Sequence, residues 1–405
     1  MKVLVINTGS SSIKYQLFNM ETQTVLCSGV VEKIGEDHGY LSHKIFKDDG
    51  STLNKEYEGK IEDHQTGFRH IVEHLINDEF GVIKNSSEIS AVGHRVVHGG
   101  ETFKSPAVIN KEVIEAITEN IPLAPLHNPS NLTGIEVAIS VFPESKQIAV
   151  FDTAFHQTIP PHAFMYALPY DMYKKERIRR YGFHGTSHAY VSGKCAEFLN
   201  KPLDQLNIIT IHLGNGASMA AVKKGKCVDT SMGMTPLEGL VMGTRTGDVD
   251  PALPFYLADY LNMSLKEIDN LLNKESGLKG LCGTNDMREV IEKKNSGDKR
   301  AELALDVYNY RIKKYIGSYY AALGRLDAII YTAGIGEHSP EIRKQSCSGL
   351  DNMGIIIDDN KNNSYKNGIE EINSDNSKVK ILVVPTNEEL RIAQMTKKII
   401  DGMSC

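Results

Sequence analysis

A short run of one glycine and three serines, residues 9–12 in the stretch "MKVLVINTGSSSIKYQLF", has the composition of a phosphate-binding turn. Glycine lets the backbone approach an anion closely, while serine hydroxyls and backbone N–H groups supply hydrogen-bond donors. The run is not a Walker A loop, because that motif needs a lysine and a Ser or Thr at fixed spacing and a helix directly after the loop. Here Ile13, Tyr15 and Leu17 stand at alternate positions, which predicts a following strand. The tip of such a hairpin either holds phosphate or is an ordinary solvated turn.

The same pattern of a strand ending in glycine occurs at two later places in the chain. "IITIHLGNG" (208–216) repeats the order of apolar, polar and glycine residues in "VLVINTG" (3–9), and "AIIYTAGIGE" (328–337) is a third copy. We expect the second copy to form another hairpin and the third to end its strand in a glycine-rich turn. A recurrence about 200 residues apart indicates a duplicated fold whose halves each present such a tip.

Helical patterns lie between these strands. Apolar residues at three-and-four spacing predict helices within residues 61–80, 128–142, 185–199 and 300–323. Strands mixed with helices in this way indicate an α/β fold. Residues 359–377, rich in Asn, Asp, Lys and Ser, are expected to form a mobile surface excursion before a strand at 379–385.

The composition favours a globular protein of two or three domains. Of the 405 residues, 41% are hydrophobic and 24% are charged, which suits apolar cores and a solvated surface. The net charge of −6 and the lack of a Lys or Arg run argue against nucleic acid as a partner. No apolar stretch has the length of a membrane span, and the six cysteines have no CxxC spacing. We therefore expect a cytoplasmic protein that binds neither nucleic acid nor membranes.

Nine segments, in order along nearly the whole chain, resemble the motifs of the acetate kinase (acetokinase) family. They are "NTGSSSIKY" (7–15), "GHRVVHGGE" (93–101), "APLHNP" (124–129), "FDTAFH" (151–156), "YGFHGTSH" (181–188), "HLGNGAS" (212–218), "DTSMGMTPLEGLVMGTRTGDVDP" (229–251), "TAGIGE" (332–337) and "PTNEEL" (385–390). The resemblance implies two duplicated ribonuclease-H-like α/β domains of the sugar kinase, actin and Hsp70 superfamily, with a nucleotide cleft between them. It implies an N-terminal domain at 1–151, completed by a helix at 388–405, and a C-terminal nucleotide-binding domain at 152–387.

The reaction implied by the resemblance is reversible transfer of the γ-phosphoryl group of ATP to acetate, which gives acetyl phosphate and ADP. It implies Mg²⁺ as the metal, with Mn²⁺ able to substitute. The chemistry needs no general base, because acetate is already a carboxylate nucleophile. The barrier lies in bringing one anion up to another, and the planar fork of arginine suits this task because it pairs with carboxylate and phosphoryl oxygens.

Two alternatives to acetate phosphorylation stay open. The nearest is a propionate kinase of the same family. The other, from a different class, is an ATP-driven binding module of the Hsp70 or actin type. Arg95 and Arg245 discriminate against that class, because they occupy the family's two active-site arginine positions and a chaperone ATPase needs no small-acid pocket.

The resemblance also assigns residues to the reacting groups and to the metal. His184 would donate a hydrogen bond to the phosphoryl group in the transition state. The catalytic set is Arg95, Asp152, His184 and Arg245, with His127 as a supporting donor. Asn7 and Glu388 would bind the metal, with Asp152 beside them, since Mg²⁺ prefers hard oxygen ligands.

A zinc site is the competing interpretation of two of the histidines. His184 and His188 stand four residues apart and could share one face of a helix. No Glu follows His184 and no third ligand is evident. His188 is therefore expected to be structural.

The remaining implied contacts bind substrates. The ATP-binding residues would be Ser12, Lys14, His212, Gly214, Asn215, Gly216, Asp286, Met287, Arg288, Gly334, Ile335 and Gly336. The acetate-binding residues would be Arg95, Val97, Leu126, Phe183 and Pro236. The resemblance further implies a homodimer.

Overall fold

The computed structural model describes residues 1–125 and 127–403, so Leu126, Ser404 and Cys405 lie outside the described residues. The chain forms two compact units. Unit 1 comprises Met1–Ala154 and Asn387–Cys405, and unit 2 comprises Phe155–Thr386. The first boundary between the units falls three residues later than the sequence predicted, at 154 and not 151, and the second falls one residue earlier, at 387 and not 388. Asp152 stays with unit 1 because its backbone N–H donates to the Val96 carbonyl at 2.9 Å, and Asn387 does so because its side chain accepts from the N–H of Leu390 at 2.8 Å.

Unit 1 is built on one mixed sheet with helices on both faces. Its strands are β1 (Lys2–Thr8), β2 (Ser12–Asn19), β3 (Thr24–Glu32), β4 (Gly39–Phe46), β5 (Thr52–Gly59), β6 (Ile89–Val96), β7 (Ala107–Val108) and β8 (Lys146–Phe151), in the spatial order β5-β4-β3-β2-β1-β6-β8-β7. Its helices are α1 (His64–Leu75), α2 (Lys111–Glu119), α3 (Asn128–Val141) and α15 (Glu388–Met403).

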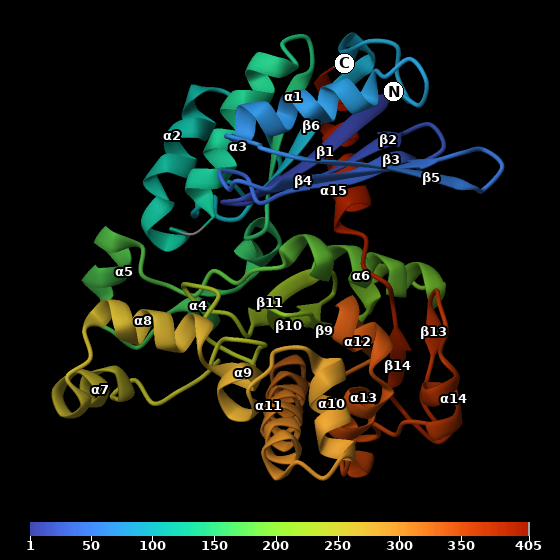
Figure 1. The fold of residues 1–405 in the computed structure, drawn as a ribbon. Helices are drawn as coiled ribbons and strands as arrows, with labels where there is room; N and C mark the ends of the chain where they lie inside the picture. The colour runs from blue at the N-terminus through green and yellow to red at the C-terminus, as the bar shows by residue number, and fades with distance from the viewer. Residues whose placement is uncertain (126, 404–405) are drawn as a thin grey trace. The chain divides into compact units, whose positions relative to one another are not determined.

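Alternate residues of β1 explain why both faces of this sheet are covered. Leu4 and Ile6 pack into a cluster with residues of α1 and α3, whereas Val3 and Val5 pack into another cluster with residues of α15. Side chains of a strand alternate between the two faces of the sheet. The strand is therefore buried on both sides, and Figure 1 shows α1 and α3 together along one face of the sheet.

Unit 2 has a second mixed sheet. Its strands are β9 (Asn207–Leu213), β10 (Ala217–Lys223), β11 (Lys226–Thr230), β12 (Ala328–Thr332), β13 (Glu370–Glu371) and β14 (Lys380–Val383), in the order β11-β10-β9-β12-β14-β13. Its helices are α4 (Pro161–Phe164), α5 (Tyr170–Glu176), α6 (Gly185–Phe198), α7 (Leu253–Leu261), α8 (Leu265–Lys274), α9 (Gly277–Cys282), α10 (Met287–Asn295), α11 (Lys299–Leu323), α12 (Ala333–His338), α13 (Pro340–Cys347) and α14 (Asp359–Ser364). Figure 1 shows α6 and α11 on opposite sides of this sheet.

The two sheets share a strand order. The series β3-β2-β1-β6-β8 in unit 1 corresponds to β11-β10-β9-β12-β14 in unit 2. In each series three antiparallel strands are followed by two strands parallel to the central one. The two predicted hairpins are confirmed as β1–β2 and β9–β10. The four predicted helices are confirmed as α1, α3, α6 and α11. The α/β fold class is also confirmed.

One local prediction is wrong and another is incomplete. The third glycine-containing copy ends in the helix α12 rather than in a turn, because the chain goes on from β12 to its parallel neighbour β14 and parallel neighbours need a crossover. The surface excursion expected at residues 359–377 contains regular structure, namely α14 and β13. Asn362 of α14 is buried, and its side chain accepts a hydrogen bond from the Arg343 guanidinium at 2.7 Å.

Two further observations concern the whole described chain. No described helix combines the length and apolar character that crossing a bilayer requires. Within residues 1–125 and 127–403, the cysteines are unpaired and buried, namely Cys27, Cys195, Cys227, Cys282 and Cys347.

Candidate active site

The carboxyl edge of the parallel strands in unit 1 brings an arginine and two carboxylates together. Arg95 lies near the end of β6, and Asp152 directly follows β8, its parallel neighbour. The Arg95 guanidinium donates from Nη2 to Oδ2 of Asp152 at 2.5 Å, and its Nε lies 4.0 Å from Oε2 of Glu388 at the start of α15. Three predicted site residues from distant parts of the sequence therefore meet at one edge.

The charges of this cluster do not balance. Burial, together with the nearby Asp152 and Glu389 carboxylates, raises the pKa of Glu388 to about 7, and Arg95 offsets only part of the shift. Burial by itself would lower the pKa of Arg95, but Asp152 and Glu388 outweigh that effect and raise it. A carboxyl group with a raised pKa beside a second, buried carboxylate lacks sufficient positive charge nearby. The cluster is therefore suited to a further cation.

The donor set fits Mg²⁺. Asn7 lies at the end of β1, the parallel neighbour of β6, with Ile6 opposite His94 in the register. Its amide oxygen and the carboxylates of Asp152 and Glu388 are hard ligands of the kind that Mg²⁺ prefers. Throughout residues 1–125 and 127–403, no group of three or more His, Cys, Asp or Glu side chains could by itself hold a metal. Mg²⁺ usually keeps several waters and binds through one or two carboxylates, so these few ligands would suffice.

The first hairpin tip lies beside these residues in the sheet. The Gly9 N–H donates to the Ser12 carbonyl at 2.8 Å and closes the turn. A Cβ atom on Gly9 would lie 2.9 Å from Ser12 Oγ, so the Ser12 side chain would have to shift to admit one. Lys14, an exposed residue of β2, pairs with Asn7 in the register of the two strands. Ser12 and Lys14 thus flank the end of the strand that carries Asn7.

The second hairpin tip, in unit 2, lies beside His184 and Arg245. The Gly214 N–H donates to the Gly216 carbonyl at 3.0 Å. A Cβ atom placed on Gly216 would lie 3.5 Å from His184 Nε2 and 3.7 Å from Arg245 Nη1. The His184 ring stacks on that of His212, with 4.3 Å between the ring centroids. One imidazole and one guanidinium therefore converge on a glycine turn.

The backbone of His184 is unusual. It is the N-cap residue of α6 and has a φ of 56°, in the left-handed region. A residue other than glycine seldom adopts that conformation, and such strain is concentrated at functional sites. Seven other described non-glycine residues also have a positive φ, so this conformation supports the motif-based assignment of His184 and does not identify the residue by itself.

Arg245 differs from Arg95 because it has no carboxylate partner among the residues that the structure describes. Its Nη1 donates to the Pro236 carbonyl at 3.1 Å and lies 3.9 Å from the Met242 sulfur. Burial lowers its pKa. A partly buried cation with only neutral acceptors favours the approach of an anion.

A pocket of about 570 Å³ lies next to the second hairpin tip. Seven predicted ATP-binding residues line it, namely Gly214, Asn215, Asp286, Met287, Arg288, Gly334 and Ile335. Its volume is in the range of small-ligand and cofactor sites. His212, Gly216 and Gly336 do not line it, and Ser12 and Lys14 belong to unit 1.

Four residues of this pocket were not predicted: Asn285, Ile291, His338 and Ser339. Ile291 lies one helical turn after Met287 in α10, so helical spacing could have identified it. Asn285 has a defined role, because its side-chain amide donates to Asn215 Oδ1 at 3.0 Å and fixes the tip residue. Asp286 caps α10 by accepting from the Arg288 N–H at 2.9 Å and also pairs with the Arg288 guanidinium at 2.5 Å.

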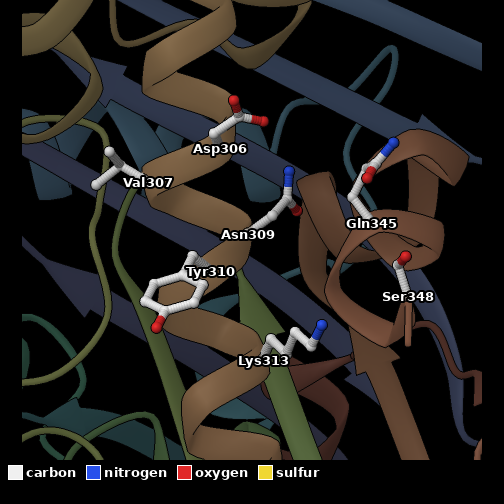
Figure 2. A pocket seen from close by; sticks show the side chains of 7 residues that line it. All are labelled: Asp306, Val307, Asn309, Tyr310, Lys313, Gln345 and Ser348. Atoms are coloured by element: carbon white, nitrogen blue, oxygen red, sulfur yellow. The ribbon is translucent and has the colours of Figure 1, made fainter. Parts of the chain in front are cut away.

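A second hollow in unit 2, of about 430 Å³, contains none of the predicted residues. Figure 2 shows Asn309 and Lys313 extending from α11 toward the segment that carries Gln345 and Ser348. Gln345 and Ser348 are exposed. The hollow is thus a surface depression separate in its lining from the pocket beside the hairpin tip.

The predicted acetate-binding residues are divided between the units. Val97 follows β6 in unit 1 and is buried, while Phe183 and Pro236 belong to unit 2. Phe183 is buried and precedes His184, and the Pro236 carbonyl holds Arg245. Leu126 lies outside the described residues. His127, the predicted supporting donor, is the N-cap residue of α3.

Comparisons with known proteins agree along the whole chain. The acetokinase family profile matches residues 2–394. The acetate kinase of Oleidesulfovibrio alaskensis is 54% identical over 402 residues, which are 99% of this chain and 100% of that protein. The crystal structure of Porphyromonas gingivalis acetate kinase is 46% identical with a TM-score of 0.93, and that of a propionate kinase from Francisella tularensis is 44% identical with a TM-score of 0.91. Each alignment covers 98% of this chain and 99% of the other. The chain therefore belongs to the acetokinase family.

Proposed function

We propose that this chain is an acetate kinase, which transfers the γ-phosphoryl group of ATP reversibly to acetate and forms acetyl phosphate and ADP. The names of its full-length relatives support this assignment. The observation that carries the proposal is Arg245, a partly buried cation without a carboxylate partner among the described residues, beside a glycine turn. Such a group is suited to an anion that arrives with the substrates.

The proposed mechanism relies on charge compensation. The acetate carboxylate attacks the γ-phosphorus and ADP leaves, so no residue has to remove a proton. Arg245, His184 and Arg95 would supply donors to the oxygens that carry charge in the transition state. Asp152 would orient Arg95 through their ion pair.

Mg²⁺ would be held by Asn7 and Glu388, with Asp152 beside them, and it would neutralise phosphate charge when bound. The raised pKa of Glu388 supports a cation there. Mn²⁺, which also prefers oxygen ligands, would substitute. We place the adenosine of ATP in the 570 Å³ pocket, which makes unit 2 the nucleotide-binding domain.

Acetyl phosphate trapped with hydroxylamine tests this function. The purified full-length protein with ATP, acetate and Mg²⁺ is expected to give the coloured iron hydroxamate complex. A reaction without acetate provides the background. No colour above that background would remove the proposal.

Propionate is the second candidate acceptor, because the 44% identical relative from Francisella tularensis is a propionate kinase. The two acids share their carboxylate and differ by one methylene. An extra methylene is worth about 1–3 kcal/mol in a closed apolar site. We expect acetate to be preferred over propionate by about tenfold in kcat/KM.

We also propose a cytoplasmic homodimer. An exposed apolar surface supports the dimer. On α7 and at the start of α8, large apolar side chains are exposed, namely Phe255 (71% exposed), Tyr256, Tyr260, Leu261 and Leu265 (81%). Exposed apolar clusters of this kind mark association surfaces. Light scattering after size-exclusion chromatography should give twice the 44.9 kDa chain mass, and Tyr260→Glu should shift it toward one chain. A wild-type monomer would refute the dimer.

A further inference from the structure

Four side chains form a hydrogen-bonded row that ends at His184. Thr210 Oγ1 in β9 lies 2.7 Å from His188 Nδ1 in α6. His188 Nε2 lies 2.8 Å from Ser218 Oγ in β10, and Ser218 Oγ lies 2.9 Å from His184 Nδ1. Thr210, His188 and Ser218 are fully buried. The row therefore has protein partners rather than solvent along its length.

Two arrangements of the hydrogens let the buried Ser218 hydroxyl donate within this row. Each hydroxyl has one hydrogen to donate. His188 is neutral, because burial, followed by the neighbouring His156 and His212, lowers its pKa well below the usual value. Its ring thus donates at one nitrogen and accepts at the other. In these two arrangements all the hydrogens point along the row, either toward His184 or toward Thr210.

Distances favour the direction toward His184. The other acceptor near the Thr210 hydroxyl is the Ala220 carbonyl, at 3.4 Å, which is long compared with the usual O–H···O range of about 2.5–3.0 Å. If Thr210 accepts from His188, its own hydrogen is left with that long contact in a buried place, which is costly. If Thr210 donates to His188, every hydrogen of the row lies in a short bond.

In that direction Ser218 donates to His184 Nδ1. We propose that Ser218 and His188 are positioning residues that hold His184 in the tautomer with its hydrogen on Nε2. Nε2 is the nitrogen that faces the Gly216 turn beside Arg245. A neutral His184 then presents an N–H donor toward the proposed phosphoryl position. The opposite tautomer would present a lone pair to phosphoryl oxygens.

Nitrogen NMR of the full-length protein labelled with ¹⁵N-histidine tests the tautomer directly. Long-range ¹H–¹⁵N spectra distinguish a protonated ring nitrogen from an unprotonated one, and a His184→Asn variant assigns the His184 signals by their loss. The expected result is a protonated Nε2 and an unprotonated Nδ1 at neutral pH. A neutral ring protonated on Nδ1 would overturn the proposal.

Variants test whether the row matters for catalysis. Ser218→Ala should lower kcat by about 10- to 100-fold, the scale found when a partner that orients a metal-bound histidine is removed, with the KM for acetate unchanged and the His184 tautomer no longer fixed. His188→Gln keeps an N–H that can donate to Ser218 and should retain more kcat than His188→Leu. The matched control is Ser192→Ala in α6, since Ser192 is fully buried and its hydroxyl has no partner among the described residues.

The outcomes separate this inference from the proposed function, on which its link to phosphoryl transfer rests. A Ser218→Ala protein with wild-type kcat and an unchanged tautomer would overturn the inference. If that variant fails to fold, the wild-type spectrum and the two His188 variants decide. If the wild-type protein makes no acetyl phosphate, the proposed function is refuted. The NMR measurement still decides the tautomer of His184, because it does not depend on activity.

Discussion

Replacing Arg245 with alanine should lower turnover by about 10²–10³, the scale for removing one preorganised transition-state donor. It should change the free energy of unfolding by no more than about 1 kcal/mol, because the side chain gives up one hydrogen bond to a neutral carbonyl. Burial already disfavours its charge. Its removal leaves no carboxylate of the described chain without a counter-ion.

Arg95→Ala should cost activity on the same scale, but it should also destabilise the fold. Asp152 is 1% exposed and bonds to Arg95 at 2.5 Å. Removing one partner of a buried ion pair costs about 3–5 kcal/mol, because the other charge stays buried. The two arginines are therefore expected to match in activity loss and to differ in stability.

Acetyl phosphate formation and urea unfolding should be measured on both alanine variants and on Arg245→Lys, which keeps the charge but not the planar fork. Wild-type turnover in Arg245→Ala would remove that residue from the mechanism. An Arg245→Ala protein destabilised as much as Arg95→Ala would show that Arg245 is structural and would refute the reasoning from its neutral partners.

Other perturbations test the metal, the acyl pocket and the buried histidines. Activity should vanish with a chelator and return with Mg²⁺, and Glu388→Ala should raise the Mg²⁺ requirement more than the KM for acetate; the reverse pattern would move Glu388 away from the metal. Val97→Ala should narrow the preference for acetate over propionate, chiefly through a lower KM for propionate, whereas an equal loss with both acids would make Val97 a packing residue. Burial lowers the pKa of both His43 and His94 to about 4. The unfolded chain therefore binds protons at these two histidines more readily than the folded chain does. The free energy of unfolding should fall as the pH is lowered from about 6.5 to 4, by at most about 1.4 kcal/mol per pH unit for each group. A flat urea-unfolding profile across that range would contradict it.

Local patterns predicted the hairpins well, because a strand and a tight turn depend on neighbouring residues. A run of apolar residues followed by Gly9, or by Gly214 and Gly216, gives the same hairpin in both units. The third copy has the same local pattern but a different continuation. Its strand β12 lies between two parallel neighbours, and this sheet position depends on residues far away in the sequence.

In the site, too, local motifs identified single residues, whereas contacts between distant residues could not be predicted. Motifs identified Arg95 and Asp152, but their ion pair joins residues 57 positions apart and depends on the register of β6 and β8. No pattern could have singled out Ser218, a common residue whose role depends on His184 and His188 of α6 reaching the same strand. The expectation that His188 is structural is consistent with its burial, and the row of hydrogen bonds adds a proposed role in orienting the catalytic ring.

Phosphorus NMR of the wild-type protein with ATP, Mg²⁺ and acetate tests the central claim most directly, because it follows where the γ-phosphoryl group goes. The proposed function predicts an acetyl phosphate resonance that grows together with ADP and depends on acetate. Inorganic phosphate and ADP as the only products, independent of acetate, would indicate an ATPase of the actin or Hsp70 kind and would contradict the assignment.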